Sequence, residues 1–148
     1  MRTALVIEDD EFAMKVFIAV LRRCGFRIAR AANGIRAVEV CRRIRGALDL
    51  IICDVMLPGS SGPAVMMQAS EVAPATPILF TSGTPLQGWS ERDAEYLQAL
   101  RSKTNCEFLP KPFRASRLVE AIQGLLSRTD QPGVPPRGIR DRLRELAA

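Results

Sequence analysis

Five short runs typical of β-strands alternate with five segments of helical spacing, and this alternation constrains the fold more than any other feature. The expected strands are Thr3–Ile7, Arg27–Ala31, Leu48–Cys53, Pro77–Thr81 and Glu107–Leu109. Strictly alternating strands and helices favour a (βα)5, doubly wound α/β fold, in which an open five-stranded parallel sheet carries helices on both faces. Leu48–Cys53 is apolar except for Asp49, which suits a strand that is covered on both sides.

The expected helices lie between and after these strands. They cover Glu11–Cys24, Ile35–Arg45, Pro63–Val72, a segment capped by Ser90 that runs to Arg101, and Ser116–Leu126. The first helix has an apolar stripe that we expect to face the core. Its members are Ala13, Val16, Phe17, Val20 and Leu21.

Beyond Ser127 the composition changes, which predicts one domain over residues 1–127 and a Pro/Arg-rich linker with a short tail over 128–148. Prolines and glycines in Gln131–Gly138 indicate the linker. Ile139–Ala148 has the spacing of a helix that is too short to be stable alone. About 20 residues are too few for a helix-turn-helix module, so no DNA-binding domain is expected.

Composition excludes several kinds of site. The chain has no histidine, which removes Ser-His-Asp and Cys-His catalysis and any Cys/His zinc site. Its four cysteines are widely spaced, and we expect buried free thiols. The net charge of +5 raises the possibility of nucleic-acid binding, but no basic run is interleaved with aromatic residues. Scattered, solvated arginines are the favoured interpretation, and a basic surface would equally attract an acidic partner protein.

Membrane and secretory signals are missing from the sequence. No apolar run reaches the ~18 residues that a membrane-spanning helix needs. The first residues pass directly from a short apolar run into acidic residues, unlike a secretory signal. We therefore expect a cytoplasmic protein without membrane contact.

Acids, a hydroxyl and a lysine follow the expected strands. In an open parallel sheet the functional site lies beyond the carboxyl ends of the strands, so these side chains should surround one crevice. Clustered carboxylates repel one another unless a cation lies among them, and Mg²⁺ prefers such oxygen ligands. With a lysine and a hydroxyl, the set suits phosphoryl transfer to an aspartate nucleophile. The residues are Glu8, Asp9, Asp10, Asp54, Ser82 and Lys111.

Four segments, in this order, resemble the motifs of response-regulator receiver domains of bacterial two-component systems. They read VIEDDE, LIICDVMLPGSSG, ILFTSG and LPKPF, and the resemblance covers about residues 3–127. It implies a flavodoxin-like sheet of strand order 2-1-3-4-5. It also implies a stand-alone, chemotaxis-receiver-like signalling domain rather than an enzyme, whose catalysis is limited to its own phosphorylation and dephosphorylation.

The resemblance assigns the phosphoacceptor and the metal ligands. Asp54 resembles the aspartate that is phosphorylated. Glu8 and Asp9 resemble the acid pair that binds Mg²⁺ together with Asp54 and the backbone carbonyl of Met56. Asp9 and Asp10 are an alternative pair, although spacing to the helix favours the first.

The resemblance also assigns a phosphate-pairing lysine and a conformational switch. Lys111 resembles that lysine, and its bond to Pro112 resembles the family's cis peptide. Ser82 aligns with the switch hydroxyl of the family, and Thr81 is the alternative. Phe108 aligns with the switch aromatic residue. The stretch from Ser82 to Lys111 is several residues longer than in compact receivers, so we expect a reshaped fourth helix or preceding loop.

The implied phosphodonor is a sensor histidine kinase or a histidine phosphotransfer protein, while the downstream partner is not named by the sequence. Phe12, Met14 and Ile18 fall outside the expected core stripe of the first helix. Exposed apolar residues beside an active site often mark a partner surface, so we expect the donor to dock there.

Three alternative functions stay open. One is a phosphate-independent interaction module, and another is the receiver piece of a hybrid histidine kinase. The third is an Asp-nucleophile phosphohydrolase, which usually needs a second acid two residues after the nucleophile. Met56 occupies that position.

Overall fold

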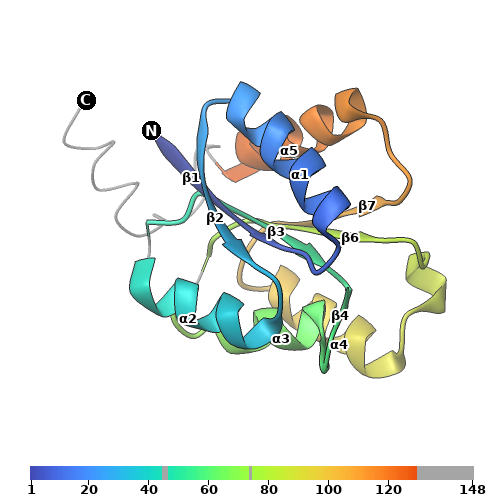
Figure 1. Ribbon diagram of the computed structural model, residues 1–148. Helices are drawn as coiled ribbons and strands as arrows, with labels where there is room; N and C mark the ends of the chain where they lie inside the picture. Colours follow the sequence, from blue (N-terminus) through green and yellow to red (C-terminus); the bar gives the residue numbers. More distant parts are fainter. Residues whose placement is uncertain (45–46, 74, 130–148) are drawn as a thin grey trace.

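The computed structural model describes residues 1–44, 47–73 and 75–129, and a five-stranded sheet forms its centre (Figure 1). All neighbouring strands are parallel, and their order is β2-β1-β3-β6-β7. Counting only the strands of this sheet, the order is 2-1-3-4-5, so the expected doubly wound fold is confirmed. The strands are β1 (Arg2–Ile7), β2 (Phe26–Ala31), β3 (Leu50–Asp54), β6 (Ile78–Ser82) and β7 (Cys106–Pro110).

Helices cover both faces of the sheet. One face carries α1 (Glu11–Arg23) and α5 (Ala115–Thr129), and the other carries α2 (Gly34–Ile44), α3 (Gly62–Ala69) and α4 (Glu91–Arg101) (Figure 1). No helix within the described ranges is long and apolar enough to cross a membrane.

Each face of the sheet has its own apolar core, and β3 contributes to both. Leu50 and Ile52 belong to the cluster beneath α1 and α5, whereas Ile51 and Cys53 belong to the cluster on the opposite face. Successive side chains of a strand point to opposite faces. The uninterrupted apolar run of β3 therefore follows from burial on both sides, as predicted.

Polar caps and one glycine fix the ends of the helices. The Asp10 carboxylate accepts a hydrogen bond from the Phe12 amide at 3.2 Å and begins α1. Ser90 accepts from the Asp93 amide at 3.1 Å, so the predicted cap of α4 is confirmed. Gly25 ends α1 with a φ of +84°, a conformation that favours glycine.

Three segments differ from the expectation. The loop expected after β3 contains a short antiparallel hairpin of β4 (Met56–Leu57) and β5 (Ser60–Ser61). The loop after β6 contains a 3₁₀ turn, η1 (Leu86–Gly88). The last helix, α5, continues to Thr129, so the boundary predicted after Ser127 falls inside it. The rest of the predicted linker and tail, from residue 130 on, lies outside the described residues.

The rotation of α1 about its axis differs from the predicted one. Met14 and Ile18 are only 6% and 9% exposed, and both pack in the core beneath α1 and α5. With Phe17 and Leu21 they form a stripe at positions i, i+3, i+4 and i+7, the spacing of one helix face. Met14 and Ile18 were therefore wrongly expected to be exposed, whereas Phe12 is 75% exposed.

The cysteines are all free thiols, and most of them are buried. Cys41, Cys53 and Cys106 lie in the apolar interior, as expected. Cys24 is exposed because it is the C-cap of α1, beyond the helix face that packs on the sheet, so the expectation was wrong there.

Candidate functional site

The carboxyl ends of four strands bring the predicted site residues to one edge of the sheet. β3 ends at Asp54 and β6 at Ser82, and the chain continues from β1 into Glu8 and from β7 into Lys111. The parallel register keeps these ends level. The Lys111 amide also donates to the Ser82 carbonyl at 2.8 Å, which extends the pairing of β6 and β7 by one step.

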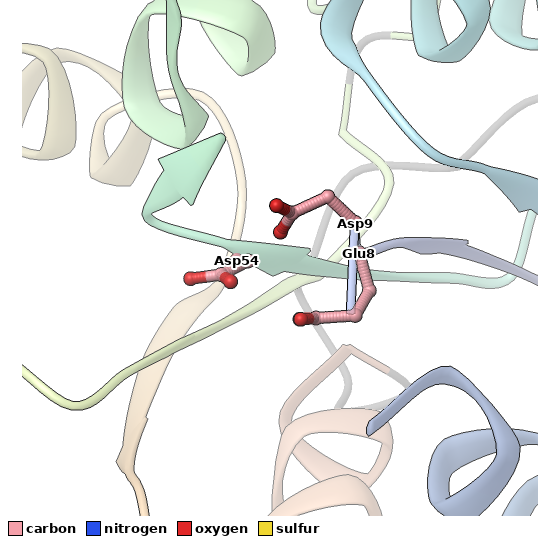
Figure 2. Close-up of side chains that lie close together, drawn as sticks. All are labelled: Glu8, Asp9 and Asp54. Atoms are coloured by element: carbon pink, nitrogen blue, oxygen red, sulfur yellow. The ribbon is translucent and has the colours of Figure 1, made fainter. Parts of the chain in front are cut away.

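Three carboxylates form an acidic cluster at this edge. Oxygens of Glu8, Asp9 and Asp54 lie within 4.8 Å of one another, and Figure 2 shows them at the ends of β1 and β3. Glu8 is 2% and Asp54 7% exposed, while Asp9 is exposed. Asp10 instead caps α1 with its side chain, so the acids grouped with Asp54 are Glu8 and Asp9.

The ammonium group of Lys111 joins two of these carboxylates. Its Nζ lies 3.2 Å from Glu8 Oε2 and 3.3 Å from Asp54 Oδ2. The other Asp54 oxygen, Oδ1, accepts a hydrogen bond from the Met56 amide at 3.0 Å. The peptide bond between Lys111 and Pro112 is cis, as predicted. Asp54 is thus held at both oxygens by donors from different segments.

The site carries more negative charge than its lysine neutralises. Burial and the nearby charge of Asp54 raise the pKa of Glu8 to about 7, although Lys111 opposes the shift. Burial lowers the pKa of Lys111, but the charges of Asp54 and Glu8 outweigh it and raise that pKa above its usual value. Clustered carboxylate oxygens with one ammonium beside them fit a hard divalent cation such as Mg²⁺.

Both candidate switch hydroxyls are buried near the cluster. Ser82 is 1% exposed, and its Oγ accepts a hydrogen bond from the Thr84 amide at 3.0 Å. Thr81, on β6 opposite Asp54 in the register, is fully buried. Its hydroxyl has no hydrogen-bond partner in the part of the chain that the structure describes.

The predicted switch aromatic, Phe108, packs against a residue that the sequence reasoning missed. The ring of Trp89 meets Phe108 edge to face, with centroids 5.4 Å apart, and contacts Phe80 in the same way at 6.1 Å. Trp89 follows η1 in the long segment between β6 and α4. An isolated tryptophan in an unusually long segment was the only sequence signal for this cluster.

A comparison with known protein families agrees with this geometry. The chain matches the response regulator receiver domain over residues 4–123. It belongs to this family. The protein is therefore a receiver domain of two-component signalling, and the predicted resemblance is confirmed.

Relatives of this receiver occur both alone and within larger proteins. It is 27% identical over 128 residues to the sensor kinase CckA of Brucella abortus, covering 86% of this chain and 13% of that protein. It is equally identical to the polar-differentiation response regulator DivK of Brucella anthropi, covering 84% and 96%. The receiver thus spans nearly all of one relative and a small share of the other.

A solved structure with magnesium is also similar. The receiver domain of the sensor histidine kinase PA1611 of Pseudomonas aeruginosa is 30% identical, with a TM-score of 0.66. The match covers 85% of this chain and 98% of that one, which has a magnesium ion coordinated in its active site cleft.

Proposed function

We propose that Asp54 accepts a phosphoryl group from a phosphohistidine of a sensor histidine kinase or histidine phosphotransfer protein. The observation that carries the proposal is the position of Asp54, buried between the Lys111 ammonium and the Met56 amide. Burying a carboxylate costs free energy unless it is paired and hydrogen-bonded, so folding alone gives no reason to place one at the end of an apolar strand. Fixed donors around a nucleophile are what phosphoryl transfer requires.

The proposed step exchanges one bond for another. A carboxylate oxygen of Asp54 attacks phosphorus, the P–N bond breaks, and its electron pair stays on the donor's imidazole nitrogen. The product is an acyl phosphate on Asp54. Lys111 lies 3.3 Å from Asp54 and offers a positive charge to the phosphoryl oxygens.

Glu8, Asp9, Asp54 and the Met56 carbonyl would hold Mg²⁺, which when bound would neutralise charge on the phosphoryl group. The support is the clustering of the three carboxylates and the excess of negative charge beside Lys111. Release of the phosphoryl group to water would return Asp54 to its carboxylate. Beyond this self-phosphorylation and self-dephosphorylation, no catalytic activity is proposed.

Ser82 and Phe108 would carry the change to a partner protein. We propose that the Ser82 hydroxyl donates to the phosphoryl oxygen, and that its movement alters the packing around Phe108. Ser82 is favoured over Thr81 because it is the last residue of β6, where the chain leaves the sheet.

Phe12 is the part of the predicted docking stripe that stays exposed. It lies in the first turn of α1, close in sequence to Asp9, and Met56 beside Asp54 is a second exposed apolar residue, at 65%. We propose that the phosphodonor contacts these two side chains. Their separate positions on α1 and after β3 would let one partner surface reach Asp54 between them.

Acetyl phosphate with Mg²⁺ tests the proposed chemistry without a partner. The intact protein should gain the mass of one phosphoryl group, and Asp54→Asn should not. Asp10→Asn is the matched control, because asparagine caps a helix as well as aspartate does and Asp10 lies outside the cluster. An unchanged gain in Asp54→Asn would refute the assignment. No gain in the parent would favour a phosphate-independent module.

Whether the receiver acts alone or within a hybrid kinase needs a different measurement. DivK, which the chain covers almost completely, is a model for a stand-alone response regulator, and CckA, of which it covers 13%, is a model for the hybrid kinase. Detection of the native protein in its source cell by an antibody would give its size. A band near 16.3 kDa supports the stand-alone protein, and a band several times larger supports the kinase.

A further inference from the structure

The loop between β6 and α4 connects the proposed switch hydroxyl to the proposed switch aromatic. It begins after Ser82, and Ser90 begins the next helix. Within it, the backbone of Thr84 and the side chain of Trp89 make the contacts that link the two switch positions. These contacts form one continuous path from Ser82 to Phe108 on β7.

The first part of the path consists of two hydrogen bonds that meet at Thr84. The Thr84 amide donates to Ser82 Oγ at 3.0 Å, and the Thr84 carbonyl accepts from Trp89 Nε1 at 3.3 Å. A single residue therefore holds both the serine hydroxyl and the indole. If the hydroxyl leaves the Thr84 amide, the loop loses one of the two bonds that meet at this residue.

The second part of the path is the packing of three aromatic rings. Trp89 meets Phe80 at an interplanar angle of 80° and Phe108 at 84°. Phe80 is fully buried and pairs with Phe108 across β6 and β7, so it offers a fixed base for the indole. Phe108 is half-buried, and Trp89 covers it. A change in the packing of Phe108 would therefore alter its contact with Trp89.

We propose that Trp89 is a positioning residue that stabilises the unphosphorylated arrangement of the switch. It holds Thr84 where the Thr84 amide engages the Ser82 hydroxyl, and it packs against Phe108. When Ser82 turns to the phosphoryl group, Trp89 is released and leaves Phe108 open to a partner. The role of Ser82 in this inference rests on the proposed phosphorylation of Asp54.

Trp89 is the only tryptophan of the chain, so its fluorescence reports its own surroundings. Mg²⁺ with acetyl phosphate should shift its emission to longer wavelength and increase quenching by acrylamide. Mg²⁺ alone should not produce this change, and neither should the full mixture added to Asp54→Asn. Unchanged emission and quenching in a sample that mass measurement shows to be phosphorylated would overturn the proposal.

A second measurement needs no phosphorylation. In Ser82→Ala the Thr84 amide has no hydroxyl acceptor, so acrylamide should quench Trp89 more strongly than in the parent. Ser70→Ala is the matched control, since Ser70 is a half-buried serine at the end of α3 whose hydroxyl donates to the Met67 carbonyl. Equal quenching in parent and Ser82→Ala would overturn the link between Ser82 and Trp89. This result stands even if the parent gains no phosphoryl mass, an outcome that defeats only the proposed function.

Two substitutions separate the hydrogen bond from the ring packing. Trp89→Phe keeps an aromatic ring but removes the Nε1 donor. Acetyl phosphate should label this variant about fivefold faster than the parent, a factor that corresponds to the net contribution of one hydrogen bond. Trp89→Ala removes both and should label faster still. Leu86→Ala, in η1, tests whether any change in this loop has that effect, and it should match the parent. Parental rates in both Trp89 variants, or equal acceleration in Leu86→Ala, would overturn the positioning role.

Discussion

The α-carbon of Gly62 lies against the backbone of Asp54, so that a Cβ at position 62 would stand 2.2 Å from the Asp54 carbonyl oxygen. The Gly62 amide also donates to the Val55 carbonyl at 2.8 Å. The β4–β5 hairpin thus returns the chain so that α3 begins directly against the end of β3. Because the nearest obstructing atom belongs to the backbone, no side-chain rotation can make room for a larger residue.

Gly62→Ala should displace the end of β3 and the carboxylate that it carries. We expect the free energy of unfolding to fall by about 1–3 kcal/mol, as in other overpacked sites, and labelling by acetyl phosphate to slow. Gly124→Ala on α5 is the control, because a Cβ at position 124 would meet nothing within 4 Å and alanine favours helices. Urea unfolding of both variants checks this prediction. An unfolding midpoint of Gly62→Ala equal to that of Gly124→Ala would contradict it.

Lys111→Met should reduce the rate of phosphorylation on the order of 100-fold, the usual effect of removing one fixed donor from a site of charge development. Methionine keeps a similar length but has no charge for the phosphoryl oxygens. Mass measurements over time give the rate. Lys103→Met, at an exposed position, is the control, and a parental rate in Lys111→Met would exclude the lysine from the chemistry.

Glu8 should make the metal-free protein less stable as pH rises. Its pKa is about 7 in the folded protein against 4.5 ordinarily, because of burial and the charge of Asp54. Between these values the folded state holds a proton that the unfolded state has released, so the free energy of unfolding falls as pH rises and levels off above pH 7. The loss amounts to about 3 kcal/mol, because the pKa of Glu8 is about 7 in the folded protein and 4.5 ordinarily.

Glu8→Gln removes this titration, so urea unfolding in EDTA between pH 5 and 8 should show a flatter profile in the variant. Lys111 stays charged throughout that range because its pKa is raised. Profiles of parent and variant that run parallel would contradict the assignment of the effect to Glu8.

Cys24 should be the only thiol that reacts rapidly with iodoacetamide in the folded protein. It is exposed, whereas burial raises the pKa of Cys41 to about 11 and that of Cys106 to about 12, and raises that of Cys53 as well. Mass measurement at pH 8 should show one modification before unfolding in urea and four after it. Cys24→Ser should show none before unfolding. Rapid modification of that variant would mean that the interior opens readily.

The sheet and the acidic site could be predicted from sequence because their signals are local. An apolar run that stops at a charged residue marks a strand end, and parallel topology brings such ends together. Glu8, Asp54 and Lys111 were found in this way. Spacing to the first helix already favoured Glu8 and Asp9 over Asp10 as the acid pair, and the structure adds the reason, because the Asp10 side chain caps α1.

The rotation of α1 about its axis could not be predicted, and neither could the cluster of Phe80, Trp89 and Phe108, because both depend on tertiary contacts. About two thirds of the residues of α1 are apolar, so two stripes fit its spacing, and packing against the sheet selected the one with Met14 and Ile18. Trp89 reaches Phe108 because β6 and β7 are neighbours. The spacing of residues within the long loop does not predict the contact between Trp89 and Phe108.

The ion pair between Glu8 and Lys111 joins residues 103 positions apart, near the two ends of the domain. A ribosome makes the acidic residues early and the lysine late, and a domain generally folds as a unit. A nascent or truncated chain that lacks β7 therefore exposes carboxylates without their counter-charge. The full charge arrangement of the proposed site therefore exists only once β7 has been made, so we expect a chain truncated before Lys111 to be labelled by acetyl phosphate far more slowly than the complete domain.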